Sequence, residues 1–306
     1  MNDSTKDFTI DDELTLKDIF SVLWQKKIKI LIFSSLISIF TFFYSLSLPN
    51  MYKSEAILAS SFEDSDSGLQ PLQNLAGISF LQDSSSKMSD KGIEIMKSLN
   101  FFEKLASKNN IFFELMAVDG WNAKKNVLLI DSSIYSQKKQ KWTSNSPFSK
   151  DGRPSMQEAH RKFLKLFQVN YVPGKRFVEI SIVHYSPEVA KKWLELIIYE
   201  INEISRLNEM NSAEKSFNYL EKEISETNLI EVRQGLSKLV ENQAEKMIYA
   251  KATPEFLFKI LASPYAPEIK SHPSRILYFI ISFFISFIAA YFYFLARYFL
   301  NKDQEK

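Results

Sequence analysis

The side chains that commonly carry acid–base or metal chemistry are few in this chain, and their spacing does not form a site. The three histidines, His160, His184 and His272, have no partner at the spacing of metal ligands. The chain contains no cysteine, which excludes disulfides, thiolate zinc sites and cysteine nucleophiles. We therefore expect no metal site, and we interpret His184, which ends a predicted strand, as a structural residue.

Phosphate chemistry and hydrolysis also lack their usual motifs. Gly174-Lys175 is followed by arginine, and no glycine stands five residues before Gly174, so the Walker-type phosphate loop is absent. No Gly-x-Ser-x-Gly nucleophile elbow occurs either. Carboxylate pairs such as Glu200 and Glu203 fall on the polar side of a predicted helix, which is typical of a solvated face. We expect no catalytic residues, no cofactor and no enzyme activity.

Charge and hydropathy direct attention to the ends of the chain. With 38 basic and 36 acidic residues the net charge is only +2, whereas nucleic-acid binders normally carry a clear basic excess. Mean hydropathy is slightly negative, −0.15, although some stretches are intensely apolar. The apolar residues must therefore be concentrated in a few segments.

Two segments are long and apolar enough to cross a bilayer. Residues 276–295 contain no charge, and 20 residues rising 1.5 Å each match a hydrocarbon core of about 30 Å. Residues 30–48 form the second segment. A signal peptide is the alternative there, but the apolar stretch is too long and no small-residue cleavage site follows it.

Basic residues set the expected topology. Lys26, Lys27 and Lys29 precede the first span, and Arg297 and Lys302 follow the second, which places both termini in the cytoplasm. Helical spacing of apolar residues before the first span predicts an amphipathic helix on the inner surface, with a frayed tail as the alternative. We divide the chain into this N-terminal segment (1–27), transmembrane helix 1 (28–48), an extracytoplasmic domain (49–275), transmembrane helix 2 (276–296) and a cytoplasmic tail (297–306).

Small residues recur along the second span. Ser282, Ser286 and Ala290 stand four residues apart on a helix otherwise rich in Phe, Ile and Tyr. Such spacing lets helix backbones approach closely. We predict that these three residues form a packing stripe, with Ser34 and Ser38 of the first span or a neighbouring subunit as the partner.

The domain between the spans is predicted to combine strands and helices. Its clearest strand is 176–186, where apolar and polar residues alternate. The further expectations are a strand at 51–60, a loop with a short helix at 61–90, a helix at 93–106, a short strand or helix end at 126–131, and a helix whose first turn contains Pro154.

A very long helix follows this strand. Ser186 and Pro187 suit its N-cap and first residue, and no further proline occurs through Thr253. A single helix over about 187–253 would span on the order of 100 Å. The alternative is a helix that breaks once, and the candidate break points are 208–212 and Gly235. So thin a helix needs partners for its apolar side, and copies of itself are the expected ones. The packing stripe that we assign to it consists of Trp193, Ile197, Ile201 and Ile204.

Three stretches of the chain resemble the chain-length determinant family, the Wzz-type polysaccharide co-polymerases. They are "LTLKDIFSVLWQKKIKILIF" with "SLPNMYKSEAIL", then "FVEISIVHYSPEVAKKWLELIIYEINE", and finally "FLFKILASPYAPEIKSHPSRILYF". The last stretch matches P-E-x-K-S-x-P-x-R. One departure from the family is that the span that follows lacks the usual glycines, and Ser282, Ser286 and Ala290 take their place as small residues. The residues of this proline-rich segment that we single out are Pro264, Pro267, Pro273 and Arg275.

The resemblance implies an α+β membrane protein: two transmembrane helices flank a periplasmic α/β base domain that carries a long protruding helix. It also implies a ring-shaped homo-oligomer in the bacterial inner membrane that sets the modal length of O-antigen or a related polysaccharide without catalytic residues. The implied partners are further copies of the chain, a Wzy-type polymerase and the membrane, with the growing lipid-linked glycan as a further candidate. A capsule or exopolysaccharide export component of the same fold is the alternative, and the short predicted tails, which contain no kinase, favour the regulator.

Overall fold

The computed structural model describes residues 16–304 apart from 62–84, 146, 150 and 173–176. The chain divides into two compact units. One unit combines residues up to 49 with those from 273 onward, and the other comprises residues 50–272. Most of the predicted loop with a short helix at 61–90, and residues 1–15 of the N-terminal segment, lie outside the described residues.

The first unit is a pair of helices, α1 (Leu16–Ser47) and α10 (Arg275–Gln304), packed along each other. Within them, Lys26–Ser47 and Arg275–Tyr298 have the length and composition needed to cross a membrane, with mean hydropathies of 1.9 and 2.2. Most of their large apolar side chains are exposed rather than buried in the unit. The two apolar terminal helices predicted from the sequence are confirmed, and α1 continues unbroken from Leu16 into its apolar part.

The second unit contains a four-stranded antiparallel sheet. Its strands are β1 (Tyr52–Ser60), β6 (Phe167–Val172), β7 (Phe177–His184) and β8 (Phe258–Ala262), in the order β6-β7-β1-β8. The register pairs Ala56 with Ile180 and Leu58 with both Val178 and Ile260. The central strand β7 buries Val178 and Ile180, as its alternating pattern predicts.

Among the shorter helices, α4 (Ser85–Lys97) and α7 (Met156–Leu166) pack on this sheet. Helix α5 (Leu99–Lys108) packs in turn against α4 and α7, and α6 (Ile111–Met116) packs against α5 and α7. The predicted helix at 93–106 is in fact divided, because the Ser98 hydroxyl accepts the N–H of Phe101 (3.2 Å) and so caps a new helix. Pro154 was expected in the first turn of α7, but Ser155 is the N-cap and Pro154 precedes it. Two small hairpins, β2 (Val118–Asn122) with β3 (Val127–Ile130) and β4 (Tyr135–Ser136) with β5 (Lys141–Trp142), complete the domain.

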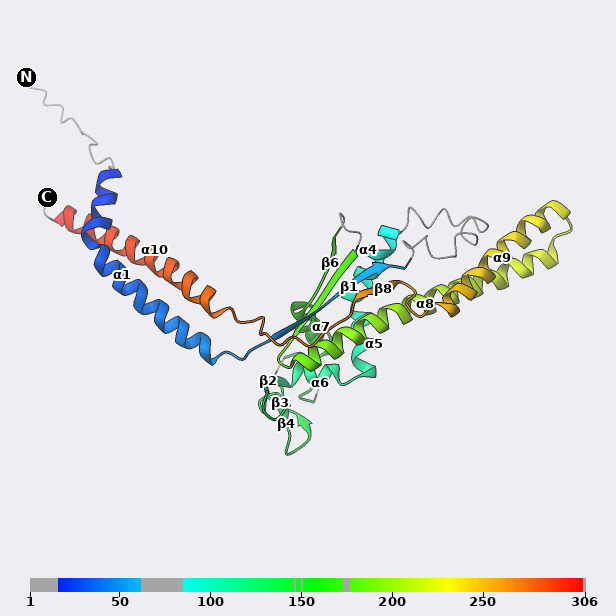
Figure 1. Cartoon of the computed structure of the whole chain (residues 1–306), viewed down its shortest axis with the longest axis horizontal. Coiled ribbons are helices and arrows are strands. Elements are labelled where there is room, and N and C mark those ends of the chain that lie inside the picture. The colour runs from blue at the N-terminus through cyan, green and yellow to red at the C-terminus, as the bar shows by residue number, and fades with distance from the viewer. Residues whose placement is uncertain (1–15, 62–84, 146, 150, 173–176, 305–306) are drawn as a thin grey trace, which may run out of the picture. The chain divides into compact units, whose positions relative to one another are not determined.

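The long helical segment is a helical hairpin and not a single helix. Helix α8 (Pro187–Glu226) ends at an extended turn, and α9 (Ile230–Ala252) returns alongside it (Figure 1). This corrects both candidate break points, since 208–212 and Gly235 lie inside continuous helix. The turn at 227–229 has extended ψ angles of 133° at Thr227 and 117° at Leu229, and the Arg233 side chain donates to the Thr227 carbonyl (2.9 Å).

Candidate functional site

Helix α8 has one face in the core of the domain. Trp193, Ile197, Ile201 and Ile204, the predicted packing stripe, are all buried there among residues of the sheet and the shorter helices. This corrects the expectation that these residues pack against copies of the chain. The sheet supplies the partner that the apolar face of α8 needs.

Polar groups anchor the start of α8. The Trp193 indole N–H donates to Glu114 Oε2 (2.6 Å), and the ring centroid of Trp193 lies 4.8 Å from that of His184. The Ser186 backbone N–H donates to His184 Nδ1 (3.0 Å) at the turn from β7 into α8. Burial lowers the pKa of His184 to about 4, so the imidazole is neutral near pH 7. Its role in the structure is to satisfy the backbone of this turn.

Glu200 contradicts the expectation of a solvated carboxylate. Its side chain is only 2% exposed and accepts two hydrogen bonds from the Lys108 ammonium of α5, the one to Oε2 at 2.9 Å. The hydrogen bond to Glu200 raises the pKa of Lys108, against the lowering effect of desolvation. This ion pair ties α8 to α5.

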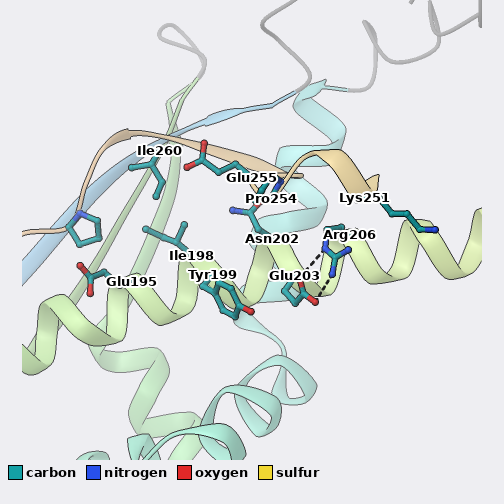
Figure 2. A pocket seen from close by; sticks show the side chains of 11 residues that line it. Glu195, Ile198, Tyr199, Asn202, Glu203, Arg206, Lys251, Pro254, Glu255 and Ile260 are labelled. Carbon is teal, nitrogen blue, oxygen red and sulfur yellow. Dashed lines mark hydrogen bonds and ion pairs between the residues drawn. The ribbon is translucent and has the colours of Figure 1, made fainter. Parts of the chain in front are cut away.

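A groove of about 450 Å³ lies beside the opposite side of α8. Figure 2 shows Ile198 of α8 facing Ile260 of β8 across it, with Asn202 to one side of this pair, further along α8. The residues that line the groove are Glu195, Ile198, Tyr199, Asn202, Glu203 and Arg206 from α8, and Lys251, Pro254, Glu255, Ile260 and Pro264 from the end of α9 onward.

Asn202 holds the two walls of the groove together. Its amide oxygen accepts the backbone N–H groups of Leu257 and Phe258 (both 2.8 Å), and its amide nitrogen donates to the Phe258 carbonyl (2.9 Å). Asn202 and both of its partners are buried. One side chain thus fixes the start of β8 to α8.

The rim of the groove is charged. Arg206 donates through Nε and Nη2 to the two oxygens of Glu203 (3.0 and 2.7 Å), and this hydrogen bonding lowers the pKa of the Glu203 carboxyl. Tyr199 on the same helix is largely exposed. Carboxylate, guanidinium and phenol groups offer many donors and acceptors to a hydroxyl-rich ligand. Among the residues that the structure describes, no group of three or more His, Cys, Asp or Glu side chains could hold a metal ion.

The proline-rich segment turns back along the start of β1. The Ser54 hydroxyl donates to the Tyr265 carbonyl (2.8 Å), and the Ser271 N–H donates to the Met51 carbonyl (2.8 Å). Within the domain, Pro264 and Pro267 are buried, and Pro264 also lines the groove. In the other unit, Pro273 is buried and Arg275 is the first residue of α10.

The small residues of α10 lie partly against α1. Ser286 and Ala290 are buried, whereas Ser282 is half-buried. The Ser286 hydroxyl lies 3.5 Å from the Ser34 carbonyl oxygen of α1, and Ser34, like Ser38, is fully buried.

Sequence reasoning missed Lys108 and Asn202. Asn202 has a detectable signal, because it stands four residues after Ile198 and so on the apolar side of the helix. A polar side chain in such a position is buried and must be hydrogen-bonded. Lys108 has no such signal, because its partner Glu200 is 92 residues away in the chain.

Residues 12–109 match the family model of Wzz, the chain length determinant protein. A search of curated proteins finds no match. Among solved structures, a full-length bacterial polysaccharide co-polymerase is similar at 11% identity and a TM-score of 0.35, covering 95% of this chain and 100% of its own. A fragment of WzzB, a polysaccharide co-polymerase from Salmonella Typhimurium, gives 11% identity and 0.29 over 73% of this chain and 100% of its own. A mutant of the Shigella flexneri lipopolysaccharide O-antigen chain-length regulator WzzBSF gives 9% and 0.23 over 72% and 100%.

The match over residues 12–109 confirms the resemblance to the Wzz family. It covers α1, β1, α4 and α5. The mixed helix and sheet content with apolar helices at both ends confirms the predicted fold class.

Proposed function

We propose that this protein is a non-enzymatic regulator of polysaccharide chain length, of the kind that sets O-antigen length in lipopolysaccharide. The observation that carries the proposal is the Wzz family match across α1 and the start of the adjoining domain. The described groove supports it, because its lining combines charged, polar and apolar side chains that can bind a sugar chain. In this function the protein acts as an oligomeric scaffold for a Wzy-type polymerase.

The proposal includes a location for each part of the chain. Helices α1 and α10 cross the inner membrane, both termini are cytoplasmic, and residues 50–272 lie in the periplasm. The hydropathy of both helices and the lysines that precede the first apolar stretch support this arrangement. Packing of Ser286 and Ala290 on α1 keeps the two spans together.

The groove beside α8 is the place at which we expect the growing glycan to bind. Hydroxyl groups of a sugar chain can exchange hydrogen bonds with its carboxylates, its guanidinium and the Tyr199 phenol. The apolar ring of Tyr199, 63% exposed, offers a flat surface next to these polar groups. Partners of this kind hold a chain transiently and so can influence when elongation stops.

The test is a lipopolysaccharide gel of a strain that lacks the gene. We expect the ladder to lose its preferred length and to regain it with the wild-type gene. Complementation with Tyr199→Ala should shift the preferred length. Tyr219→Ala is the matched control, because Tyr219 is also 63% exposed on α8 but lies outside the groove. Total loss of surface polymer with internal accumulation would instead show an export component, and an unchanged ladder in the Tyr199 variant would remove the groove from the mechanism.

A further inference from the structure

The β2–β3 hairpin presents apolar and basic side chains together. Val127 and Leu129 of β3 are 54% and 48% exposed. They share one face of the hairpin, since alternate residues of a strand point the same way. Lys124 and Lys125 are exposed in the turn immediately before them.

The hairpin is attached to the point at which the chain enters and leaves the domain. The Trp121 ring of β2 packs edge-on against Tyr52, with centroids 5.6 Å apart, and the Trp121 N–H donates to Asn126 Oδ1 (2.9 Å). Beside Tyr52, Met51 forms a backbone bridge with His272. This bridge joins the segment that enters the domain to the segment that leaves it.

The connecting segments between this bridge and the two apolar helices are short. Met51 follows the end of α1 at Ser47 by four residues, and α10 begins at Arg275, three residues after His272. An extended chain covers at most about 3.6 Å per residue, so the segment after α1 reaches about 14 Å and the segment before α10 about 11 Å. If α1 and α10 cross the bilayer, the end of the domain that bears the hairpin is held next to the lipid surface.

The charges on this end of the domain favour an anionic surface. The hairpin also carries acidic residues: Asp119 lies in β2 and Asp131 directly follows β3, at the end of the hairpin away from its turn. Both act electrostatically on Lys162 of α7. Burial lowers the pKa of Lys162, and the two carboxylates oppose that effect. Lys124 and Lys125 are therefore the charged residues of the turn itself. The neighbouring β4–β5 hairpin adds further exposed lysines, Lys138, Lys139 and Lys141.

We propose that the β2–β3 hairpin docks on the surface of the bilayer, with Val127 and Leu129 in the headgroup region and Lys124 and Lys125 against anionic phospholipid headgroups. Apolar side chains flanked by lysines and an aromatic residue suit this interface. The inference rests on the proposed membrane-anchored function. It adds a second attachment that fixes the orientation of the domain on the membrane.

The absence of cysteine from the chain permits a direct test in the full-length protein. Val127→Cys is labelled with a bimane fluorophore, and the protein is reconstituted in vesicles of phosphatidylethanolamine and phosphatidylglycerol that contain doxyl-labelled lipid. We expect the doxyl group to quench this label. Val232→Cys is the matched control, a valine on α9 of similar exposure (45%), and its label should stay unquenched. Adding Lys124→Glu and Lys125→Glu should lower the docked-to-undocked ratio at least about 25-fold, because each lysine lost near an anionic surface changes it roughly fivefold.

A third label separates this inference from the function on which it rests. Phe40→Cys lies in α1, where the side chain is 74% exposed, and should be quenched whenever the chain is inserted. Without quenching at 40, the proposed membrane anchoring fails. Quenching at 40 but not at 127 overturns the docking alone. A label at 127 that is shielded from water yet insensitive to doxyl lipid would show that a second copy covers the hairpin, and quenching that survives both lysine replacements would overturn the charge contribution.

Discussion

Replacing Asn202 with leucine should be among the most damaging single changes in the domain formed by residues 50–272. Leucine has nearly the same volume, but it cannot make the three buried hydrogen bonds to Leu257 and Phe258. Two N–H groups and one carbonyl would lose their partners where water does not reach them. Each such unpaired group costs about 1–3 kcal/mol, so we expect a total loss of roughly 3–9 kcal/mol for the three groups.

A loss of this size is easily measured against a total stability of about 5–15 kcal/mol. The assay is pulse proteolysis of the full-length protein in detergent across a urea series. Asn211→Leu is the control, because Asn211 is exposed on the same helix and gains the same helix propensity from leucine. The control should stay within about 0.5 kcal/mol of wild type. If Asn202→Leu costs less than about 1 kcal/mol relative to this control, the three bonds do not hold β8 to α8 and the reasoning is refuted.

Three further predictions concern other contacts of the helices. Lys108→Met should cost about 3 kcal/mol in the same assay, because the buried Glu200 carboxylate loses its cation, and the double variant with Glu200→Met should recover most of that loss. His184 should make unfolding depend on pH: its pKa is lowered to about 4 and the unfolded imidazole titrates near 6.5, so stability is full above pH 6.5 and falls by up to about 3 kcal/mol as the pH drops to 4. His184→Asn should flatten urea midpoints measured across this window, and an unchanged slope would contradict the assignment. Ser286→Phe should weaken cross-linking between α1 and α10 without preventing insertion, whereas Ile288→Phe, at an exposed position on the same helix, should leave it intact.

The elements predicted correctly from the sequence are those specified by local signals. The alternation of Val178 and Ile180 identifies β7, and Ser186 followed by Pro187 locates the start of α8 to the residue. The terminal helices are recognisable from composition alone, because a bilayer span requires about 20 apolar residues in sequence. None of these features depends on a distant part of the chain.

The turn of the helical hairpin could not be located in this way. No proline or glycine occurs at 227–229, whereas Gly235, the apparent breaker, lies inside α9. A glycine in a helix costs only about 1 kcal/mol relative to alanine. Packing of α9 along α8, which buries Ala213 and Ala250, outweighs a cost of that size. The position of the turn is therefore decided by tertiary contacts.

The groove and the ion pair escaped prediction for the same reason. Glu200 and Glu203 have the same residue type and stand less than one turn apart, yet one is buried against α5 and the other lies at the rim of the groove. Which of them faces inward depends on where α5 and β8 pack, and both come from distant parts of the chain.

The fold also limits how copies of this protein can assemble. The side chains that the sequence favoured for self-association, including Trp193 and Ile197, already cover the domain's own sheet. An oligomer that used them would have to unfold the domain that it is built from. Large apolar side chains remain exposed on α9 instead, among them Ile230 near the turn and Ile248 toward the base. Contacts between copies that leave the domain folded must therefore use exposed surface, and these side chains of α9 are part of it.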